Sequence, residues 1–326
     1  MLDTWIRRLL FGALSAAVAL LSACSPVPQA PLRTAVNIWP GYEPLLLARE
    51  LGYLDDHTVR LVEYSSDSQA LRSYRNGAVD ATALTLDESL LLAQEGLRPR
   101  IVTVMDFSNG ADVIMGRPDI RSLAELKGRR VGVEDTALGA YFLARVLQIA
   151  GLRDRDIQVV PLELDEVVPA YLAGRIDVAV TAEPGRTQLL AAGARQLFDS
   201  SRIPGAIVDV LVVRQSYLQL HPGRVQAMLG GWYRALDYLR GHPQDAARRM
   251  AHREGLTAQQ FTAALSLLKL PTLAENRHLL SGPTPALQAT AQQVAQVMLA
   301  HHLLRTPVDV KAMLDGTLLA KLEAAH

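Results

Sequence analysis

The chain has 326 residues, a balance of 33 basic and 33 acidic side chains, and 49% apolar residues. A surface without net positive charge argues against a nucleic-acid-binding protein, which needs basic side chains to neutralise phosphates. The length suffices for two lobes of ordinary domain size, and a single cysteine leaves no intramolecular disulfide to stabilise them. The fold must therefore rest on an apolar core.

The first 23 residues have the pattern of a secretory signal. Arg7 and Arg8 precede an apolar run at 9–21 that is too short for a membrane span. Leu21-Ser22-Ala23-Cys24 resembles the lipobox of bacterial lipoproteins, which implies cleavage after residue 23 and a lipid on Cys24. We then expect the mature protein on the periplasmic or cell-surface side, anchored to a membrane. Ser25 after the cysteine favours the outer membrane where two membranes exist; the alternative is an ordinary signal peptide that ends at a lone cysteine.

Residues 24–32 contain three prolines and predict an extended tether. After it, short β-branched runs alternate with helical patterns, which predicts an α/β fold. The strands expected first are Thr34–Trp39, Thr58–Glu63, Val79–Leu84 and Ile101–Met105. The helices expected between them are Tyr42–Leu51, Asp67–Arg75 and Leu86–Glu95.

A second alternating set follows, and then a helical tail. It opens at Ser122, which with Glu125 three residues later is typical of a helix capping box. The strands expected in this set are Arg130–Val133, Ile157–Pro161, Asp177–Val180, Gln196–Phe198 and Ile207–Val213. The expected helices are Leu138–Ala150 and Asp165–Leu172, followed in the tail by Arg224–Arg240, Pro243–Ala251, Ala258–Leu268 and Pro285–Leu304.

The two sets share a local pattern at a spacing of 97 residues. Tyr74, Gly77 and Asp80 recur 97 positions later as tyrosine, glycine and aspartate, each time around a helix end, a turn and a strand start. Such junctions favour these residue types in any case, so chance is an alternative. The common spacing favours two equivalent lobes, whose parallel strands would present their carboxyl ends to a ligand.

Three stretches resemble the extracytoplasmic substrate-binding proteins of ABC importers for nitrate, alkanesulfonates, taurine and pyrimidine precursors of thiamine. They are Asn37-Ile38-Trp39-Pro40-Gly41-Tyr42-Glu43-Pro44, Ser122-Leu123-Ala124-Glu125-Leu126-Lys127-Gly128-Arg129-Arg130-Val131-Gly132-Val133, and Gly174-Arg175-Ile176-Asp177-Val178-Ala179. The resemblance implies a type II periplasmic-binding-protein fold, an α/β chain of two lobes with mainly parallel sheets and a helical C-terminal part.

The same resemblance implies the domain organisation and the partners. Lobe 1 would combine residues 33–105 with 214–326, and lobe 2 would be 106–213 with crossover strands near Met105–Ala111 and Asp209–Gln215. The implied partners are a small-molecule ligand, a permease and an ATPase, with the binding protein a monomer that needs no cofactor. A ligand-sensing receptor that activates a membrane signalling protein would use the same cleft, so that alternative stays open.

The cleft residues expected from lobe 1 follow its strand ends. Pro40-Gly41 stops the first strand between Trp39 and Tyr42, so the indole offers a flat wall for a ring or a cationic head, and the phenol a hydroxyl. The other polar residues expected at this edge, as ligand contacts or as helix caps, are Asn37, Ser65 and Thr85.

Acids dominate the cleft positions expected from lobe 2 and the crossovers. The acids at these positions are Asp106, Asp112, Glu134, Asp135, Glu183 and Asp209, against Arg186 alone. All of these acids except Asp135 are expected ligand contacts, and Asn109 and Thr136 complete the set. This surplus of acids disfavours nitrate, sulfonate or phosphate, because carboxylates instead accept hydrogen bonds from N–H groups. We therefore expect an amine-bearing, cationic or aminopyrimidine-like ligand, with Trp39 stacked on it.

The sequence carries no pattern of catalytic or metal-binding residues. None of the eight histidines falls at an expected cleft position, no His-Glu-x-x-His occurs, and the only thiol is that of Cys24. A pyrimidine-synthesising relative of the superfamily depends on a histidine and a cysteine-rich motif that this chain lacks. An enzyme is therefore the least favoured interpretation.

Overall fold

The strands form two mixed β-sheets, which define the two lobes. The computed structural model describes residues 30–322, so the expected signal segment, Cys24 and most of the expected tether lie outside the described residues. The sheet of lobe 1 contains, in spatial order, β11 (Leu268–Lys269), β4 (Pro99–Ser108), β10 (Val208–Arg214), β3 (Ala81–Thr85), β1 (Leu32–Val36) and β2 (Val59–Glu63). The sheet of lobe 2 contains, in spatial order, β7 (Gln158–Leu162), β6 (Arg130–Glu134), β8 (Val178–Thr181), β5 (Val113–Gly116) and β9 (Arg195–Asp199).

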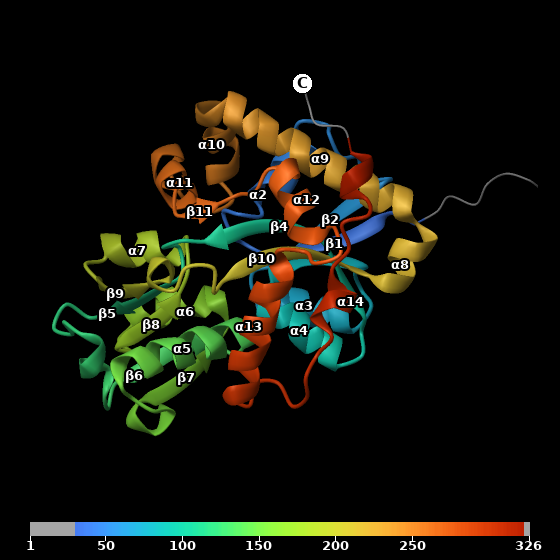
Figure 1. Ribbon diagram of the computed structural model, residues 1–326. Coiled ribbons are helices and arrows are strands. Elements are labelled where there is room, and N and C mark those ends of the chain that lie inside the picture. The colour runs from blue at the N-terminus through green and yellow to red at the C-terminus, as the bar shows by residue number, and fades with distance from the viewer. Residues whose placement is uncertain (1–29, 323–326) are drawn as a thin grey trace, which may run out of the picture. The chain divides into compact units, whose positions relative to one another are not determined.

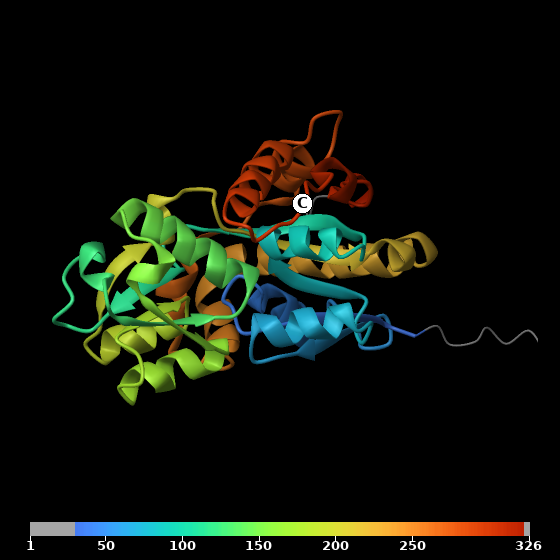
Figure 2. The ribbon, with the colours of Figure 1, turned by 90° about the horizontal axis from the view of Figure 1, so that it is seen from below.

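Helices cover both faces of the lobe 1 sheet (Figure 1). On one face α2 (Glu43–Glu50) packs with α9 (Pro222–Gly241) and α10 (Pro243–Ala251), and on the other lie α3 (Asp67–Arg75) and α4 (Leu86–Gln94). The remaining helices of this lobe are α8 (Gln215–Leu220), α11 (Ala258–Leu265), α12 (Leu273–Leu280), α13 (Leu287–Ala300) and α14 (Val310–Met313). Helix α13 lies beside α4 (Figure 2), so this part of the helical tail packs against lobe 1.

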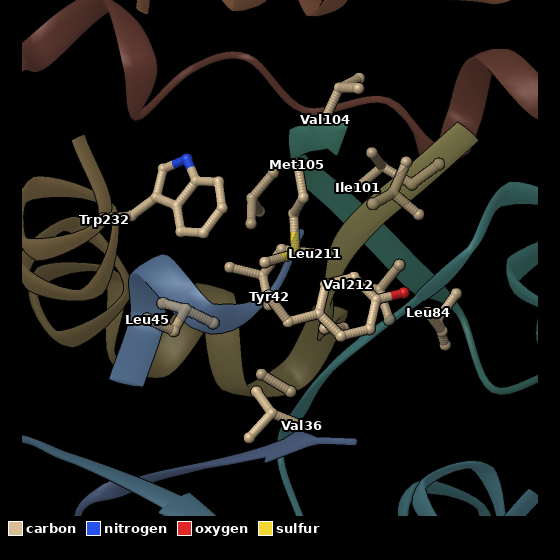
Figure 3. Packing of buried hydrophobic residues seen from close by; sticks show 14 of the residues in the cluster. Val36, Tyr42, Leu45, Leu84, Ile101, Val104, Met105, Leu211, Val212 and Trp232 are labelled. Carbon is tan, nitrogen blue, oxygen red and sulfur yellow. The ribbon is translucent and has the colours of Figure 1, made fainter. Parts of the chain in front are cut away.

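A large apolar cluster joins the sheet of lobe 1 to these helices. Figure 3 shows part of it, including Leu45 of α2, Met105 of β4 and the fully buried Trp232 of α9. Strand β10 is buried from Val208 to Val213, as expected for a strand covered on both faces. Within residues 30–322, no helix is both long and apolar enough to cross a membrane.

Lobe 2 buries its two sheet faces against different helices. Ile114 packs with Phe142 of α5 (Ala137–Ala150), whereas its neighbours in β5 pack with Val167 of α6 (Leu164–Leu172) and with α7 (Gly185–Ala191). This alternation follows from the two-residue period of side chains along a strand. The capping pattern at Ser122 starts only a single 3₁₀ turn.

The two lobes repeat each other at the predicted spacing of 97 residues. Arg33 binds Asp80 through Nε at 2.8 Å and Nη2 at 2.9 Å, and Arg130 binds Asp177 through Nε at 3.0 Å and Nη2 at 2.6 Å. Both residues of the second pair follow their counterparts by 97 positions. In lobe 1 the arginine lies at the start of β1 and the aspartate directly precedes β3; in lobe 2 the arginine lies at the start of β6 and the aspartate directly precedes β8. Each pair thus connects two neighbouring parallel strands.

The crossover strands exchange between the lobes, which corrects two expectations. Strand β10 is the counterpart of β5, yet it pairs antiparallel with β3 and β4 in lobe 1, while β5 pairs antiparallel with β8 and β9 in lobe 2. Each sheet is therefore mixed, not mainly parallel. The chain returns to lobe 1 over residues 200–207, earlier than the expected Asp209–Gln215, because β10 belongs to the lobe 1 sheet.

Candidate functional site

A cavity lies between the lobes, beside the carboxyl ends of their parallel strands. Its volume is ≈ 50 Å³, below the ~150 Å³ that holds one benzene molecule, so a ligand with a ring needs the lobes further apart. Lobe 1 and the crossovers line it with Asn37, Ile38, Trp39, Tyr42, Asp67, Thr85, Asp112, Ile207 and Asp209. Lobe 2 lines it with Val133, Glu134, Thr136, Leu138, Gly139, Phe142, Leu164, Val180, Thr181 and Ala182.

The lining follows the internal repeat. Six pairs of lining residues stand 97 positions apart, namely Asn37 and Glu134, Trp39 and Thr136, Tyr42 and Gly139, Asp67 and Leu164, Thr85 and Ala182, and Asp112 and Asp209. Equivalent positions of the two halves thus line the same cavity. Where the two members differ in chemistry, the cavity is asymmetric and can orient a ligand.

Trp39 is held from behind by a buried carboxyl group. Its indole Nε1 donates a hydrogen bond to Asp106 Oδ2 at 3.0 Å, and 6% of the residue is exposed. A Cβ on Gly41 would lie 1.9 Å from Asp106 Oδ2 and 2.6 Å from Trp39 Nε1. Glycine is therefore needed at 41 for the indole to reach the carboxyl group, and Trp39 belongs to the core as well as to the cavity.

Asp106 and Asp209 form a buried pair. They stand opposite each other in β4 and β10, and the Tyr42 hydroxyl donates to Asp209 Oδ1. Burial raises the pKa of Asp106 to about 7. Burial and the neighbouring Asp106 raise the pKa of Asp209 well above its usual value. Because two buried carboxyl groups cannot both ionise without a large electrostatic cost, the pair keeps a proton at neutral pH.

The N-terminus of α3 meets a carboxyl group of the opposite lobe. Ser66 is its N-cap, and Asp67 is its first residue and lines the cavity. Glu134 Oε1 accepts hydrogen bonds from Ser68 Oγ at 2.9 Å and Ser68 N at 3.2 Å. Free N–H groups at a helix N-terminus favour a negative charge, so this position suits the Glu134 carboxylate.

A second glutamate of lobe 2 reaches the same helix. Glu163 accepts a hydrogen bond from Ser66 Oγ at 2.6 Å and pairs with Arg72 Nη2 at 3.1 Å. It also lies within hydrogen-bond distance of Ser68 Oγ, whose single proton it shares with Glu134. The two serine hydroxyls, with burial opposing them and Arg72 assisting, lower the pKa of Glu163. Glu163 is not part of the cavity lining, so its bonds hold the lobes together without contacting the cavity.

The cavity is electrostatically one-sided. Within the described residues its lining has four acids, Asp67, Asp112, Glu134 and Asp209, and no lysine, arginine or histidine. Burial raises the pKa of Asp112 and of Glu134 to about 7. Asn37 Oδ1 and Asp112 Oδ2 are buried and have no hydrogen-bond partner among the described residues. Such acceptors cost about 1–3 kcal/mol each, so a ligand that brings N–H donors would relieve that cost.

The structure brings most of the predicted site residues together around the cavity. They are Asn37, Trp39, Tyr42, Thr85, Asp112, Glu134, Thr136 and Asp209. Asp106 lies one layer behind, where it contacts Trp39 and not the cavity. The role of all these residues as ligand contacts stays a prediction.

Glu183 does not face the cavity as expected. Its carboxylate accepts hydrogen bonds from Arg186 Nη1 at 2.9 Å and from Thr187 N at 3.1 Å. The physical reason is local, because Glu183 lies just before α7 and its carboxylate satisfies the free donors of the first helical turn.

Asn109 and Ser65 are also outside the lining. Asn109 is exposed in the first crossover, where its backbone N–H bonds to the carbonyl of Leu267. Ser65 Oγ accepts a hydrogen bond from Gln69 Nε2 at 2.9 Å, within the first turns of α3. Ser65 is thus engaged within its own helix turn and Asn109 is open to solvent, and neither lines the cavity.

Eleven of the nineteen lining residues were not predicted from the sequence, and three of them, Asp67, Phe142 and Thr181, show why. Asp67 follows the Ser65-Ser66 pair at a strand end, so its position carried a usable signal. Phe142 lies one turn inside α5, and Thr181 ends β8, two residues before Glu183. Nothing in the local pattern distinguishes Phe142 from an ordinary core residue, and it packs in the core of lobe 2 as well.

The described residues contain no group of three or more His, Cys, Asp or Glu side chains that could hold a metal ion. The lining acids are spread over both lobes, and their elevated pKa values disfavour a cluster of ionised ligands. We therefore assign no metal or cofactor to any residue of the cavity.

Comparison with known proteins agrees with this architecture. The model of the NMT1-like family matches residues 25–254, which is most of the chain. The chain belongs to the NMT1-like family. A candidate binding protein of Brucella abortus is 25% identical over 264 residues, which cover 74% of this chain and 77% of that protein.

Two solved structures show how widely this NMT1-like fold is shared. The periplasmic aliphatic sulphonate binding protein SsuA of Escherichia coli matches with a TM-score of 0.71 and 20% identity, over 88% of this chain and 92% of that one. The desulfurization enzyme DSZB matches with a TM-score of 0.64 and 19% identity, over 90% and 98%. The two-lobe periplasmic-binding-protein fold predicted from the sequence is thus confirmed.

Proposed function

We propose that this protein is the extracytoplasmic solute-binding component of an ABC-type importer. The family match and the fold shared with a periplasmic sulphonate binding protein support this. A cavity lined from both lobes suits capture by closure, because a ligand contacts both lobes only in the closed form and so increases its population. On this proposal Cys24 carries the lipid anchor, and a permease and an ATPase are the partners.

The ligand of this proposal is a small solute with N–H donors and a positive charge. The observation that carries it is the lining, which combines four acids with unpartnered oxygens of Asn37 and Asp112 and has no basic side chain among the described residues. Trp39 adds an aromatic wall, which attracts cations. An aminopyrimidine-like ligand fits the same chemistry once the lobes open to admit a ring.

A pair of probes that differ in charge tests the ligand class. Ethylammonium and ethanesulfonate have the same carbon chain, and guanidinium, 4-aminopyrimidine and nitrate widen the comparison. We expect the cationic probes to raise the melting temperature and to give saturable isothermal titrations, and the anions to do neither. Binding of ethanesulfonate in place of the cations would move the ligand class to that named for the E. coli protein, with the fold unchanged.

Uptake separates the importer from other roles of the same fold. Host cells that lack the gene should lose uptake of the bound solute, and the gene restored in trans should recover it. The match with a desulfurization enzyme makes catalysis the second candidate. The lining offers no histidine or cysteine among the described residues, so we expect the bound solute to be recovered unchanged after long incubation.

A further inference from the structure

We propose that Glu134 sets the charge selectivity of the cleft by placing the protein's own carboxylate at the N-terminus of α3, where an anionic group of a ligand would otherwise bind. This inference rests on the proposed function and names the residue of the site that excludes anions. It concerns a lobe 2 residue that acts on a lobe 1 helix.

The carboxylate of Glu134 lies at the N-terminus of α3, in the position where such a helix end binds an anion. Glu134 is the last residue of β6, it lines the cavity, and 6% of it is exposed. Its Oε1 accepts the backbone N–H of Ser68, in the first turn of the nine-residue helix α3, and shares the Ser68 hydroxyl proton with Glu163. Helix N-termini hold anions through the same backbone donors, so the carboxylate occupies a place that a sulfonate or phosphate oxygen could take.

The other lining acids do not have this arrangement. Burial raises the pKa values of Asp67, Asp112 and Glu134 alike, that of Asp67 well above its usual value and those of Asp112 and Glu134 to about 7, so the difference lies in their hydrogen-bond donors. Asp112 Oδ2 has no hydrogen-bond partner among the described residues. Among the lining acids of the described residues, Glu134 is the one whose charge is stabilised by donors from the facing lobe. Its carboxylate occupies the donors that an incoming anion would need, and it repels the charge of that anion.

The internal repeat supplies a natural reference for this position. Asn37 is the equivalent of Glu134 in lobe 1, 97 positions earlier, and it also lines the cavity. The fold thus accepts a neutral amide at one of two equivalent positions and carries a carboxyl group at the other. Glu134→Gln makes the second position chemically like the first, with little change in size.

Glu163 is the matched control. It contacts Ser66 and Ser68, as Glu134 contacts Ser68, and it connects the same two lobes, but it lies outside the lining. Glu163→Gln removes a charge at nearly the same interlobe contact. A change in closure affects all ligands equally, whereas a change in charge selectivity affects cations and anions in opposite directions.

The test measures the affinities of ethylammonium and ethanesulfonate for the full chain and for both variants by isothermal titration. In Glu134→Gln we expect the affinity for ethylammonium to fall about tenfold or more and the preference over ethanesulfonate to shrink accordingly, because a charge-assisted contact is lost. In Glu163→Gln we expect both affinities to change by the same factor. If the glutamine variant does not fold, Glu134→Ala is measured in its place, and the same loss of preference for ethylammonium is expected.

Two results would overturn the inference. One is a preference in the Glu134 variants equal to that of the wild type; the other is an equal loss of preference in Glu163→Gln. Failure of the proposed ligand class looks different, because the wild-type protein itself would then bind ethanesulfonate in preference to ethylammonium.

Discussion

At the scale of single residues, Trp39 serves the cavity and the core together. The sequence placed it at a strand end as a wall for the ligand, and it does line the cavity. The structure adds the bond from its indole to the buried Asp106 and the requirement for glycine at 41. A substitution of Trp39 is therefore expected to affect the stability of the empty protein as well as ligand binding.

Trp39→Phe should destabilise the empty protein more than Trp232→Phe. Both tryptophans are buried, but the indole nitrogen of Trp232 has no hydrogen-bond partner among the described residues, so that variant loses only ring volume. Trp39→Phe also leaves Asp106 without its donor, which should cost a further ~1–3 kcal/mol. Urea unfolding of both variants measures the difference, and equal free energies of unfolding would contradict the role given to Asp106.

At the scale of elements, the two arginine–aspartate pairs connect β1 with the residue before β3, and β6 with the residue before β8; in each lobe the first strand named is the middle one of three parallel strands. In lobe 2, the hydrogen bonds from Arg130 lower the pKa of Asp177 to about 2. A carboxyl group with a depressed pKa binds fewer protons in the native than in the unfolded state. Its stabilising contribution is therefore present above pH ~4 and is lost as the pH falls through the native pKa.

Asp177→Asn should accordingly lower the melting temperature at pH 7, and the difference from wild type should shrink between pH ~4 and ~2. Asp119→Asn is the control, because its ion pair with Arg129 is largely exposed, with 61% of the aspartate side chain accessible. Exposed pairs contribute about 0–1 kcal/mol. Calorimetric scans of the variants across this pH range measure both effects; a difference that does not depend on pH would contradict the assignment to Arg130.

At the scale of the whole molecule, buried acids couple stability, pH and ligand. Burial raises the pKa of Asp112 and Glu134 to about 7, so the native empty protein keeps protons that the unfolded chain loses above pH ~4. The free energy of unfolding contributed by these groups therefore falls as the pH rises from ~4 to ~7. A bound cation favours the ionised forms of Asp112 and Glu134, so the native protein with ligand binds fewer protons at these groups than the empty protein does.

The affinity for a cationic ligand should therefore increase as the pH rises through ~7, with release of protons on binding. Titrations of ethylammonium from pH 5 to 8, in two buffers with different ionisation enthalpies, measure the affinity and the protons together. An affinity that stays constant over this range would show that the lining acids do not face the ligand.

Anchoring is the second expectation at this scale, and it lies outside the described residues. Cys24→Ser should abolish incorporation of labelled palmitate and release soluble or unprocessed protein, because the only thiol of the chain is lost. Membrane fractionation of the host cells measures the distribution. A variant that is still lipid-labelled would exclude Cys24 as the attachment site.

The sequence by itself determined what depends on local pattern. Alternating strand and helix signals gave the α/β architecture, and the spacing of Tyr74, Gly77 and Asp80 from their counterparts revealed the repeat. Side chains at or just past strand ends, such as Glu134 and Trp39, were found because parallel strands gather their carboxyl ends at one edge. These features follow from the order of residues within about one turn or one strand.

Only the tertiary structure decided which side chains meet across the chain. Residues 106 and 209 form a pair because β4 and β10 lie side by side, although about a hundred residues separate them. Glu183 lies outside the cavity lining and bonds to Arg186 of its own helix, whereas Glu134 accepts a hydrogen bond from Ser68 of a helix in the other lobe. The reason is physical, since hydrogen bonds and burial depend on distances that the exchange of β5 and β10 sets, and no local pattern encodes that exchange.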